Sequence, residues 1–220
     1  MIKALIFDFD GLILDTETPD FESWRQTFAT FNCELSLDVW GEYIGTTTFN
    51  PYEYLESLLG SPVDRTVVHA ARKAIDNDLI AQQTILPGVV DYLNEAQTLG
   101  LQIALASSSD HSWVDHHLAR LGLFERFPII CCADDVGGRP KPDPAVYRLA
   151  IERLGISPKE GLALEDSRNG VLAGKEAGLW VTAVPNQMTQ HLNFDHADFR
   201  VSSLTEMRLE TLISRVTSNE

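Results

Sequence analysis

Two aspartates, Asp8 and Asp10, directly follow a short apolar run near the beginning of the chain. Residues two positions apart in an extended chain point to the same side, so we expect both carboxylates to face one space. Gly11 follows them, where the backbone needs a conformation that other residues resist. One carboxylate of such a pair can attack an electrophile while the other carries a proton, so the pair predicts nucleophilic and acid–base chemistry.

Polar residues also follow three later apolar runs. Ser107 and Ser108 follow one run, Lys141 lies in the loop after the next, and Glu165 and Asp166 end another. In open α/β sheets, ligands bind beyond the carboxyl ends of the strands, so we expect four loops to meet at one edge. Several carboxylates suit a hard cation such as Mg²⁺, and an ammonium group with hydroxyl and amide donors suits a phosphate group.

The elements that must position these residues are predicted from apolar runs that alternate with helical patterns. Runs of continuous apolar residues are typical of strands buried on both faces, and here they occupy residues 3–7, 102–106, 128–132, 161–164 and 180–184. Helical patterns lie between them, at residues 89–98, 112–121, 144–154 and 169–177. We therefore predict an α/β fold with a Rossmann-like, doubly wound parallel sheet, ending in an edge strand at 197–201.

One stretch, residues 16–86, interrupts this alternation. It contains no buried-strand pattern and instead predicts helices at 21–31, 37–44, 51–59 and 65–83. We predict an all-helical cap domain at 16–86, inserted into a core domain formed by residues 1–15 and 87–220. Most of the cap aromatics are expected in its core, with one or two free to line a substrate pocket; they are Trp24, Trp40, Tyr43 and Phe49.

Composition excludes several classes of protein. The 220 residues carry 17 Lys and Arg against 32 Asp and Glu, a net charge of −15, which disfavours nucleic acids and anionic membranes as partners. No apolar run approaches the length of a membrane helix, and the first run resembles a strand rather than a signal peptide. Three cysteines form no disulfide framework. We expect a cytoplasmic protein that is a monomer or a weak homo-oligomer.

Some polar residues have simpler interpretations. Ser108 and Ser109 are expected to cap the helix that begins near His111, and His111 itself remains open as a substrate contact. Asp15 and Thr16 are expected to shape the connection into the cap. The cysteine pair at 131–132 is interpreted as small core residues.

Taken together, the polar residues resemble the four motifs of the haloacid dehalogenase-like hydrolases, specifically the branch of phosphatases and β-phosphoglucomutase-like enzymes with a small helical cap. The matching segments are Asp8-Phe-Asp10-Gly11-Leu-Ile-Leu-Asp15-Thr16, Ser107, Lys141 and Glu165-Asp166. Cap position and motif order also match, so the resemblance spans essentially the whole chain. It implies a hydrolase that uses Mg²⁺ and an aspartyl-phosphate intermediate.

The resemblance also implies catalytic roles. Asp8 would be the nucleophile that takes the phosphoryl group. Asp10 would protonate the leaving oxygen and then activate water. Ser107 would hydrogen-bond the phosphoryl oxygens, and Lys141 would offset the negative charge of Asp8 and the phosphate.

Two ligand sets follow from the same resemblance. The implied phosphate contacts are Gly11, Ser107, Ser108 and Lys141. The implied Mg²⁺ ligands are Asp8, the backbone carbonyl of Asp10, Asp166, and Glu165 as a neighbouring or alternate ligand.

Departures from the β-phosphoglucomutase pattern favour hydrolysis over phosphoryl isomerisation. Asp20 stands where that pattern has a histidine, and Gly45 is followed by Thr46-Thr47-Thr48 where it has an arginine three residues on. The cap holds few basic residues for a second phosphate. We therefore predict a phosphatase for a small phosphorylated metabolite whose leaving group carries no large extra negative charge. A β-phosphoglucomutase-like phosphomutase and a non-catalytic phosphometabolite-binding protein are the alternatives.

Overall fold

A single six-stranded sheet forms the centre of the computed structural model, which describes residues 1–41 and 50–218. All neighbouring strands are parallel, in the order β3-β2-β1-β4-β5-β6. The strands are β1 (Ala4–Phe7), β2 (Gln102–Ala106), β3 (Ile129–Cys131), β4 (Gly161–Glu165), β5 (Trp180–Ala183) and β6 (Phe199–Arg200). The first strand therefore lies in the middle, between β2 and β4, so the residues that follow it face the centre of the sheet's carboxyl edge.

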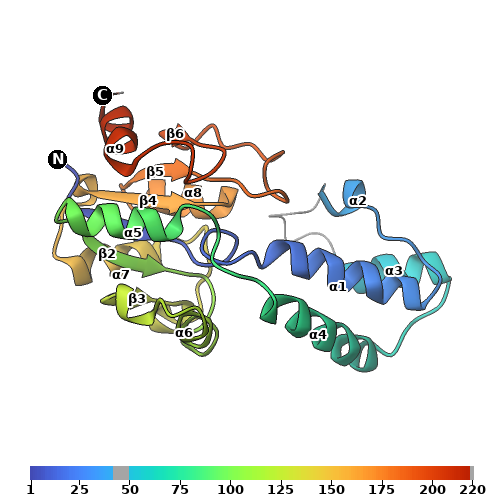
Figure 1. Cartoon of the computed structure of the whole chain (residues 1–220). Helices are drawn as coiled ribbons and strands as arrows, with labels where there is room; N and C mark the ends of the chain where they lie inside the picture. Colours follow the sequence, from blue (N-terminus) through green and yellow to red (C-terminus); the bar gives the residue numbers. More distant parts are fainter. Residues whose placement is uncertain (42–49, 219–220) are drawn as a thin grey trace.

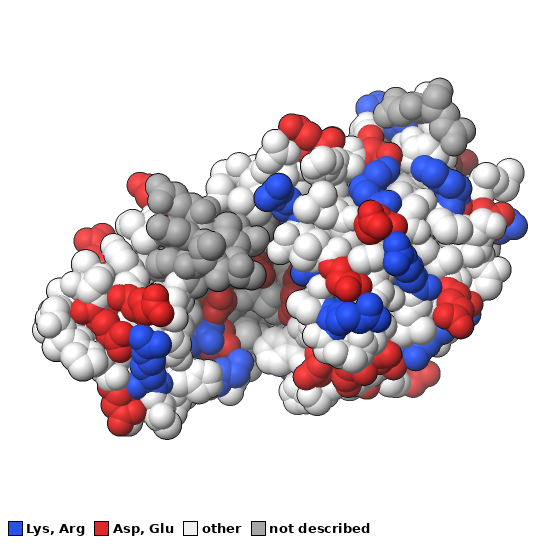
Figure 2. Space-filling view, turned by 180° about the vertical axis from the view of Figure 1, so that it is seen from behind, with Lys and Arg blue, Asp and Glu red and all other residues white. Residues whose placement is uncertain are grey.

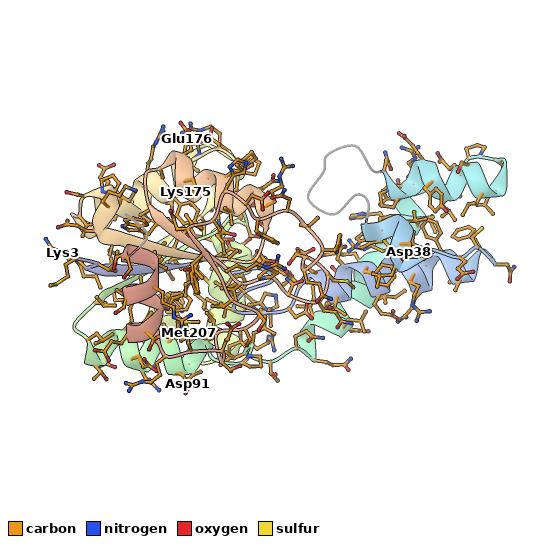
Figure 3. All side chains as sticks on the ribbon, turned by 90° about the horizontal axis from the view of Figure 1, so that it is seen from above. Lys3, Asp38, Asp91, Lys175, Glu176 and Met207 are labelled. Atoms are coloured by element: carbon orange, nitrogen blue, oxygen red, sulfur yellow. The ribbon has the colours of Figure 1, made fainter. Side chains whose placement is uncertain are left out.

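Helices cover both faces of the sheet (Figures 1 and 3). Side chains alternate along β1, so Leu5 and Phe7 belong to one buried cluster and Ala4 and Ile6 to the other. The first cluster includes residues of α5 (Val89–Thr98), α6 (His111–Arg120) and α9 (Leu209–Thr217), and the second includes residues of α7 (Ala145–Leu154) and α8 (Arg168–Glu176). Single turns of 3₁₀-helix lie at Phe124–Arg126, Ala133–Val136 (η2) and Pro158–Glu160. The predicted doubly wound fold is confirmed.

Between β1 and α5, the described residues form four helices in a separate layer that projects from the carboxyl edge of the sheet (Figure 1). We call them the helical block: α1 (Glu17–Thr30), α2 (Leu37–Gly41), α3 (Pro51–Leu59) and α4 (Arg65–Ala81). They share an apolar cluster that includes Phe21, Trp24, Phe28 and Leu55, and Met188 from the segment after β5 also belongs to it. This arrangement agrees with the predicted insertion of a helical cap. The boundaries at 15/16 and 86/87 stay a prediction.

Helix ends differ from the predicted ones where local capping decides them. The first helix begins at Glu17 instead of Phe21, because Asp15 accepts the Thr18 N–H at 3.0 Å and Pro19 fits a first turn. The edge strand is shorter than predicted, since only two of its residues pair with β5.

Within the described ranges, no helix is both long and apolar enough to cross a membrane.

Candidate active site

Asp8 and Lys141 form the buried centre of the site. Asp8 follows β1 directly, and its N–H donates to the Leu164 carbonyl at 3.0 Å, which continues the sheet by one residue. The Lys141 ammonium lies 2.6 Å from Asp8 Oδ1 and 2.6 Å from Glu165 Oε1, and donates to the Ala106 carbonyl at 2.8 Å. All three side chains are buried. Residues more than a hundred positions apart thus meet where β1, β2 and β4 end.

Neighbouring groups hold this arrangement in place. The Lys141 backbone N–H donates to Ser108 Oγ at 3.0 Å, and the Tyr147 hydroxyl on α7 donates to Glu165 Oε1. A side chain at Gly170 would put its Cβ 1.9 Å from the Glu165 carboxyl carbon, so glycine leaves room for that carboxylate. Lys141 is therefore fixed from two sides.

Negative charge exceeds positive charge in this centre. Carboxylate oxygens of Asp8, Glu165 and Asp166 all lie within 4.8 Å of one another, with Lys141 as the ammonium beside them. Burial, with repulsion from Glu165, raises the pKa of Asp8 to about 8 against the opposing effect of Lys141. Burial and the Asp8 charge raise the pKa of Asp166 well above its usual value. Carboxylates that repel one another at buried positions make a site that a divalent cation would neutralise, and oxygen donors are what Mg²⁺ prefers.

Asp166 is positioned by residues from two other segments. Asn186 Nδ2 donates to Asp166 Oδ2 at 2.8 Å and to the Gly11 carbonyl at 3.2 Å. Gly11 has φ +77°, and a Cβ there would lie 2.1 Å from Asp166 Oδ2. The Gly11 amide donates to the Leu14 carbonyl at 2.8 Å. The Gly11 N–H, which we expected to contact the phosphate, is therefore already used within this turn. The absence of a side chain at Gly11 instead leaves room for the Asp166 carboxylate.

Asp10 faces three side-chain donors. Ser109 Oγ and Ser107 Oγ lie 2.7 and 3.4 Å from its Oδ2, and Trp113 Nε1 donates to its Oδ1 at 2.9 Å. The expectation that Ser108 and Ser109 cap α6 is wrong, because Asp110 is the N-cap residue and the two hydroxyls face Lys141 and Asp10 instead. The serine run therefore contacts both Lys141 and Asp10.

Comparison with known proteins agrees with this geometry. The family model for the haloacid dehalogenase-like hydrolases matches residues 2–178. The chain belongs to this family. It is 47% identical over 219 residues to the putative phosphatase YhcW of Bacillus subtilis, with 99% of each chain covered.

Solved structures of similar proteins also align with nearly the whole chain. A mutant of CbbY from Rhodobacter sphaeroides in complex with xylulose-(1,5)bisphosphate aligns with a TM-score of 0.73 and 30% identity, covering 96% of this chain and 99% of that one. A putative β-phosphoglucomutase from Thermotoga maritima aligns with a TM-score of 0.79 and 25% identity, covering 97% and 99%. As a haloacid dehalogenase-like hydrolase, the chain is an enzyme.

Basic residues of the helical block are all paired with carboxylates in this hydrolase. Residues 16–86 contain four Lys and Arg, and none lies in the undescribed segment 42–49. The ion pairs are Arg25–Glu22, Arg65–Glu56, Arg72–Asp20, Arg72–Asp76 and Lys73–Asp76. Asp20, which replaces the histidine of the mutase pattern, thus holds Arg72. The other departures, Gly45 and Thr46-Thr47-Thr48, lie outside the described residues, as do Tyr43 and Phe49.

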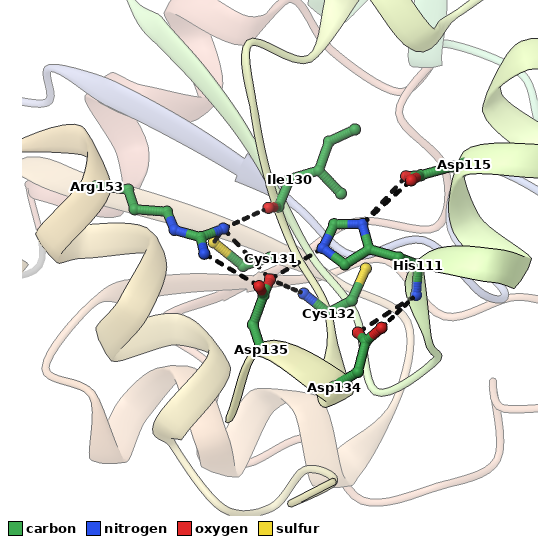
Figure 4. A network of polar contacts seen from close by, with 8 residues as sticks. All are labelled: His111, Asp115, Ile130, Cys131, Cys132, Asp134, Asp135 and Arg153. Carbon is green, nitrogen blue, oxygen red and sulfur yellow. Dashed lines mark hydrogen bonds and ion pairs between the residues drawn. The ribbon is translucent and has the colours of Figure 1, made fainter. Parts of the chain in front are cut away.

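His111 belongs to a network of its own (Figure 4). Its Nδ1 lies 3.3 Å from both Asp115 carboxylate oxygens and its Nε2 lies 3.0 Å from Asp135 Oδ2, while Arg153 also binds Asp135. Burial alone would lower the pKa of His111, but the two carboxylates outweigh it and raise the pKa. These contacts link α6 to η2, and none of them involves Asp8 or Asp10. A substrate contact by His111 stays a prediction.

The cysteines behave as core residues. Cys131 and Cys132 are fully buried, and burial raises the pKa of both thiols, that of Cys131 to about 11. Donor atoms of His111, Cys132 and Asp134 lie within 4.8 Å of one another. Both ring nitrogens of His111 already face carboxylates, so we interpret this cluster as part of the ion-paired network in Figure 4.

Sequence reasoning missed several residues of the site: Glu17, Trp113, Tyr147, Gly170 and Asn186. Glu17 is the first residue of α1, and burial together with the charges of Asp10 and Asp15 raises its pKa to about 7. Acidic side chains also lie in the hollow between the helical block and the sheet in Figure 2. Each missed residue reaches the site through helix packing or a distant loop, for which the local sequence holds no signal.

Proposed function

We propose that this hydrolase is a Mg²⁺-dependent phosphatase that releases inorganic phosphate from a small phosphorylated metabolite. The observation that carries the proposal is the buried Asp8–Lys141 pair beside Asp166, at the end of the central strand. A nucleophilic carboxylate with a fixed ammonium beside it suits an electron-rich phosphoryl group better than a neutral substrate. The similarity to the putative phosphatase YhcW of Bacillus subtilis supports the same reaction class.

The first half of the reaction transfers the phosphoryl group to Asp8. An Asp8 carboxylate oxygen attacks phosphorus, the new O–P bond forms as the ester P–O bond breaks, and Asp10 gives its proton to the leaving oxygen. Lys141 offsets charge on Asp8 and on the phosphoryl group. We assign the Ser107 hydroxyl and the Ser108 amide as donors to the phosphoryl oxygens.

The second half releases phosphate. Water attacks phosphorus of the aspartyl phosphate, its proton passes to Asp10, and the Asp8–phosphorus bond breaks. Asp8 returns as a carboxylate and Asp10 as an acid. Asp10 therefore has to face both the leaving oxygen and the attacking water.

The donor set fits Mg²⁺. We assign the ligands as Asp8, Asp166 and the backbone carbonyl of Asp10, because the two carboxylates lie together and repel one another without a cation. Glu165 stays beside this set; its Oε1 is held by Lys141 and Tyr147, so we expect it to act through Lys141. When bound, Mg²⁺ would neutralise charge on the transferring phosphoryl group.

Hydrolysis is favoured over a phosphomutase reaction by the paired cations of the helical block. A mutase must hold a bisphosphate intermediate, which requires free positive charge near the second phosphate. Arg72 and Lys73 both contact Asp76, and Arg72 also binds Asp20. A monophosphate whose leaving group carries little extra charge fits this environment best.

We propose that the helical block, residues 16–86, serves as a cap that excludes bulk water. The three cysteines that form no disulfide favour a cytoplasmic location, and we expect a monomer or weak homo-oligomer.

A phosphatase panel tests the proposal. The full chain is assayed for phosphate release from sugar monophosphates, sugar bisphosphates, nucleotides and p-nitrophenyl phosphate, with Mg²⁺ and with EDTA. We expect Mg²⁺-dependent release that is largest for monophosphates, and its loss by a factor of about 10³ or more in Asp8→Asn. Asp91→Asn, at an exposed position on α5, is the matched control. Full activity of Asp8→Asn would overturn the mechanism, and a preference for bisphosphates would overturn the monophosphate assignment.

A further inference from the structure

Asp10 is held by an indole that the reaction scheme does not include. Trp113, in the first turn of α6, donates from Nε1 to Asp10 Oδ1 at 2.9 Å, while Ser109 occupies Oδ2 at 2.7 Å. With a donor on each oxygen, the plane of the carboxylate is defined. A carboxylic acid transfers a proton efficiently only from a defined position, because the reacting atoms must be aligned.

The Trp113 ring is in turn packed between the core and the helical block. On the core side, the His117 ring lies 4.3 Å away, centroid to centroid, in an edge-on arrangement. Burial lowers the pKa of His117 to about 4, so this neighbour is neutral at pH 7. On the other side, Lys73 Nζ of α4 lies 5.2 Å from the centroid of the Trp113 ring, within the range of a cation–π contact.

The same helix is tied to α4 a second time. Arg120, the last residue of α6, donates to the carbonyls of Ile80, Ala81 and Gln83 at 3.4, 3.3 and 2.9 Å. These carbonyls belong to the last turn of α4 and to the segment just after it, where helical hydrogen bonding ends. α6 therefore contacts α4 at both of its ends.

We propose that Trp113 is a positioning residue for Asp10 and that Lys73 couples this residue to the helical block. The inference rests on the proposed function. Trp113 holds the Asp10 carboxyl at the angle needed to protonate the leaving oxygen, and the contact with Lys73 makes this angle depend on where α4 lies. Loss of Trp113 then impairs proton transfer more than phosphorus attack by Asp8.

The experiment compares two leaving groups. p-Nitrophenolate departs without a proton, whereas the alkoxide of a sugar phosphate needs one. For Trp113→Phe, we expect kcat/KM to fall about 10- to 100-fold for the best sugar phosphate of the panel and by less than about threefold for p-nitrophenyl phosphate. Lys73→Met, which removes the cation from the ring, should shift the same ratio in the same direction by about two- to fivefold.

Trp180→Phe is the matched control. Trp180 also donates from Nε1, to the Lys159 carbonyl at 3.2 Å, and carries the Lys159 ammonium 4.2 Å from its ring centroid. Its substitution should leave the ratio between the two substrates unchanged. An equal loss for both substrates in Trp113→Phe, or no loss for either, overturns the inference, and Lys73→Met decides the matter if Trp113→Phe does not fold. Absence of hydrolysis by the wild type overturns the proposed function instead.

Discussion

Gly11→Ala tests how the fold positions Asp166. Two costs follow from the structure. The residue has φ +77°, where a side chain is strained, and its Cβ would lie 2.1 Å from Asp166 Oδ2 and 2.8 Å from Asn186 Nδ2. The carboxylate must therefore move, and the hydrogen bond between Asp166 and Asn186 at 2.8 Å must break or lengthen.

Each cost has a known scale. An L-residue in the left-handed region costs about 1–2 kcal/mol, and loss of a hydrogen bond to a charged group costs about 1.5–3 kcal/mol. We expect Gly11→Ala to lower the free energy of unfolding by about 2.5–5 kcal/mol. Gly100→Ala is the matched control, because Gly100 has φ +70° but no heavy atom within 4 Å of its Cβ position. It should lose only the strain part, about 1–2 kcal/mol.

The assay is urea unfolding of both variants and the wild type at pH 7 in EDTA, followed by Mg²⁺ titration of phosphatase activity. Displacement of Asp166 should also weaken the apparent Mg²⁺ affinity about 10- to 100-fold in Gly11→Ala and leave it unchanged in Gly100→Ala. Equal destabilisation of the two variants to within about 0.5 kcal/mol, with unchanged Mg²⁺ affinity, would refute the reasoning.

Two further predictions concern pH. Because the pKa of Asp8 is raised from 3.8 to about 8, the stability that its protonated form contributes is complete below 3.8 and is lost as the pH rises through about 8. Thermal unfolding in EDTA should therefore show stability falling from pH 5 to 8, with the largest gain on adding Mg²⁺ at pH 8; a flat profile in EDTA contradicts this. The same sign applies to Glu17, whose pKa is raised from 4.5 to about 7. Glu17→Gln should stabilise the EDTA-treated protein by about 3 kcal/mol at pH 8 and hardly at pH 4, unlike Glu34→Gln at an exposed position, and an equal effect at both pH values contradicts it.

Much of the fold could be predicted because its signals are local. A strand buried on both faces must be apolar at successive positions, and this pattern marked β1, β2, β4 and β5 to within a residue or two. The lack of such runs between residues 16 and 86 separated the helical layer from the sheet. Helix ends were less predictable, since single contacts decide them, as the Asp15–Thr18 hydrogen bond does for α1.

The motif residues Asp8, Lys141, Glu165 and Asp166 could be placed together from the sequence for a topological reason. Each lies at the end of a strand or in the segment after it, and parallel strands present their carboxyl ends at one edge, so identifying the strands was enough. The functions of Ser108, Ser109 and Gly11 could not be predicted in the same way. Whether a serine hydroxyl caps a helix or faces a lysine depends on the exact path of the loop, which the local sequence does not fix.

The sequence by itself determined which chemistry this protein carries: a carboxylate pair, a lysine, serines and further carboxylates at one edge of a parallel sheet. Only the tertiary structure decided how those groups are held. Trp113 reaches Asp10, Asn186 reaches Asp166, and Tyr147 reaches Glu165, across separations of up to 103 residues. Such contacts depend on how helices pack against the sheet, which is set by the shape of the whole core and not by any local pattern of residues.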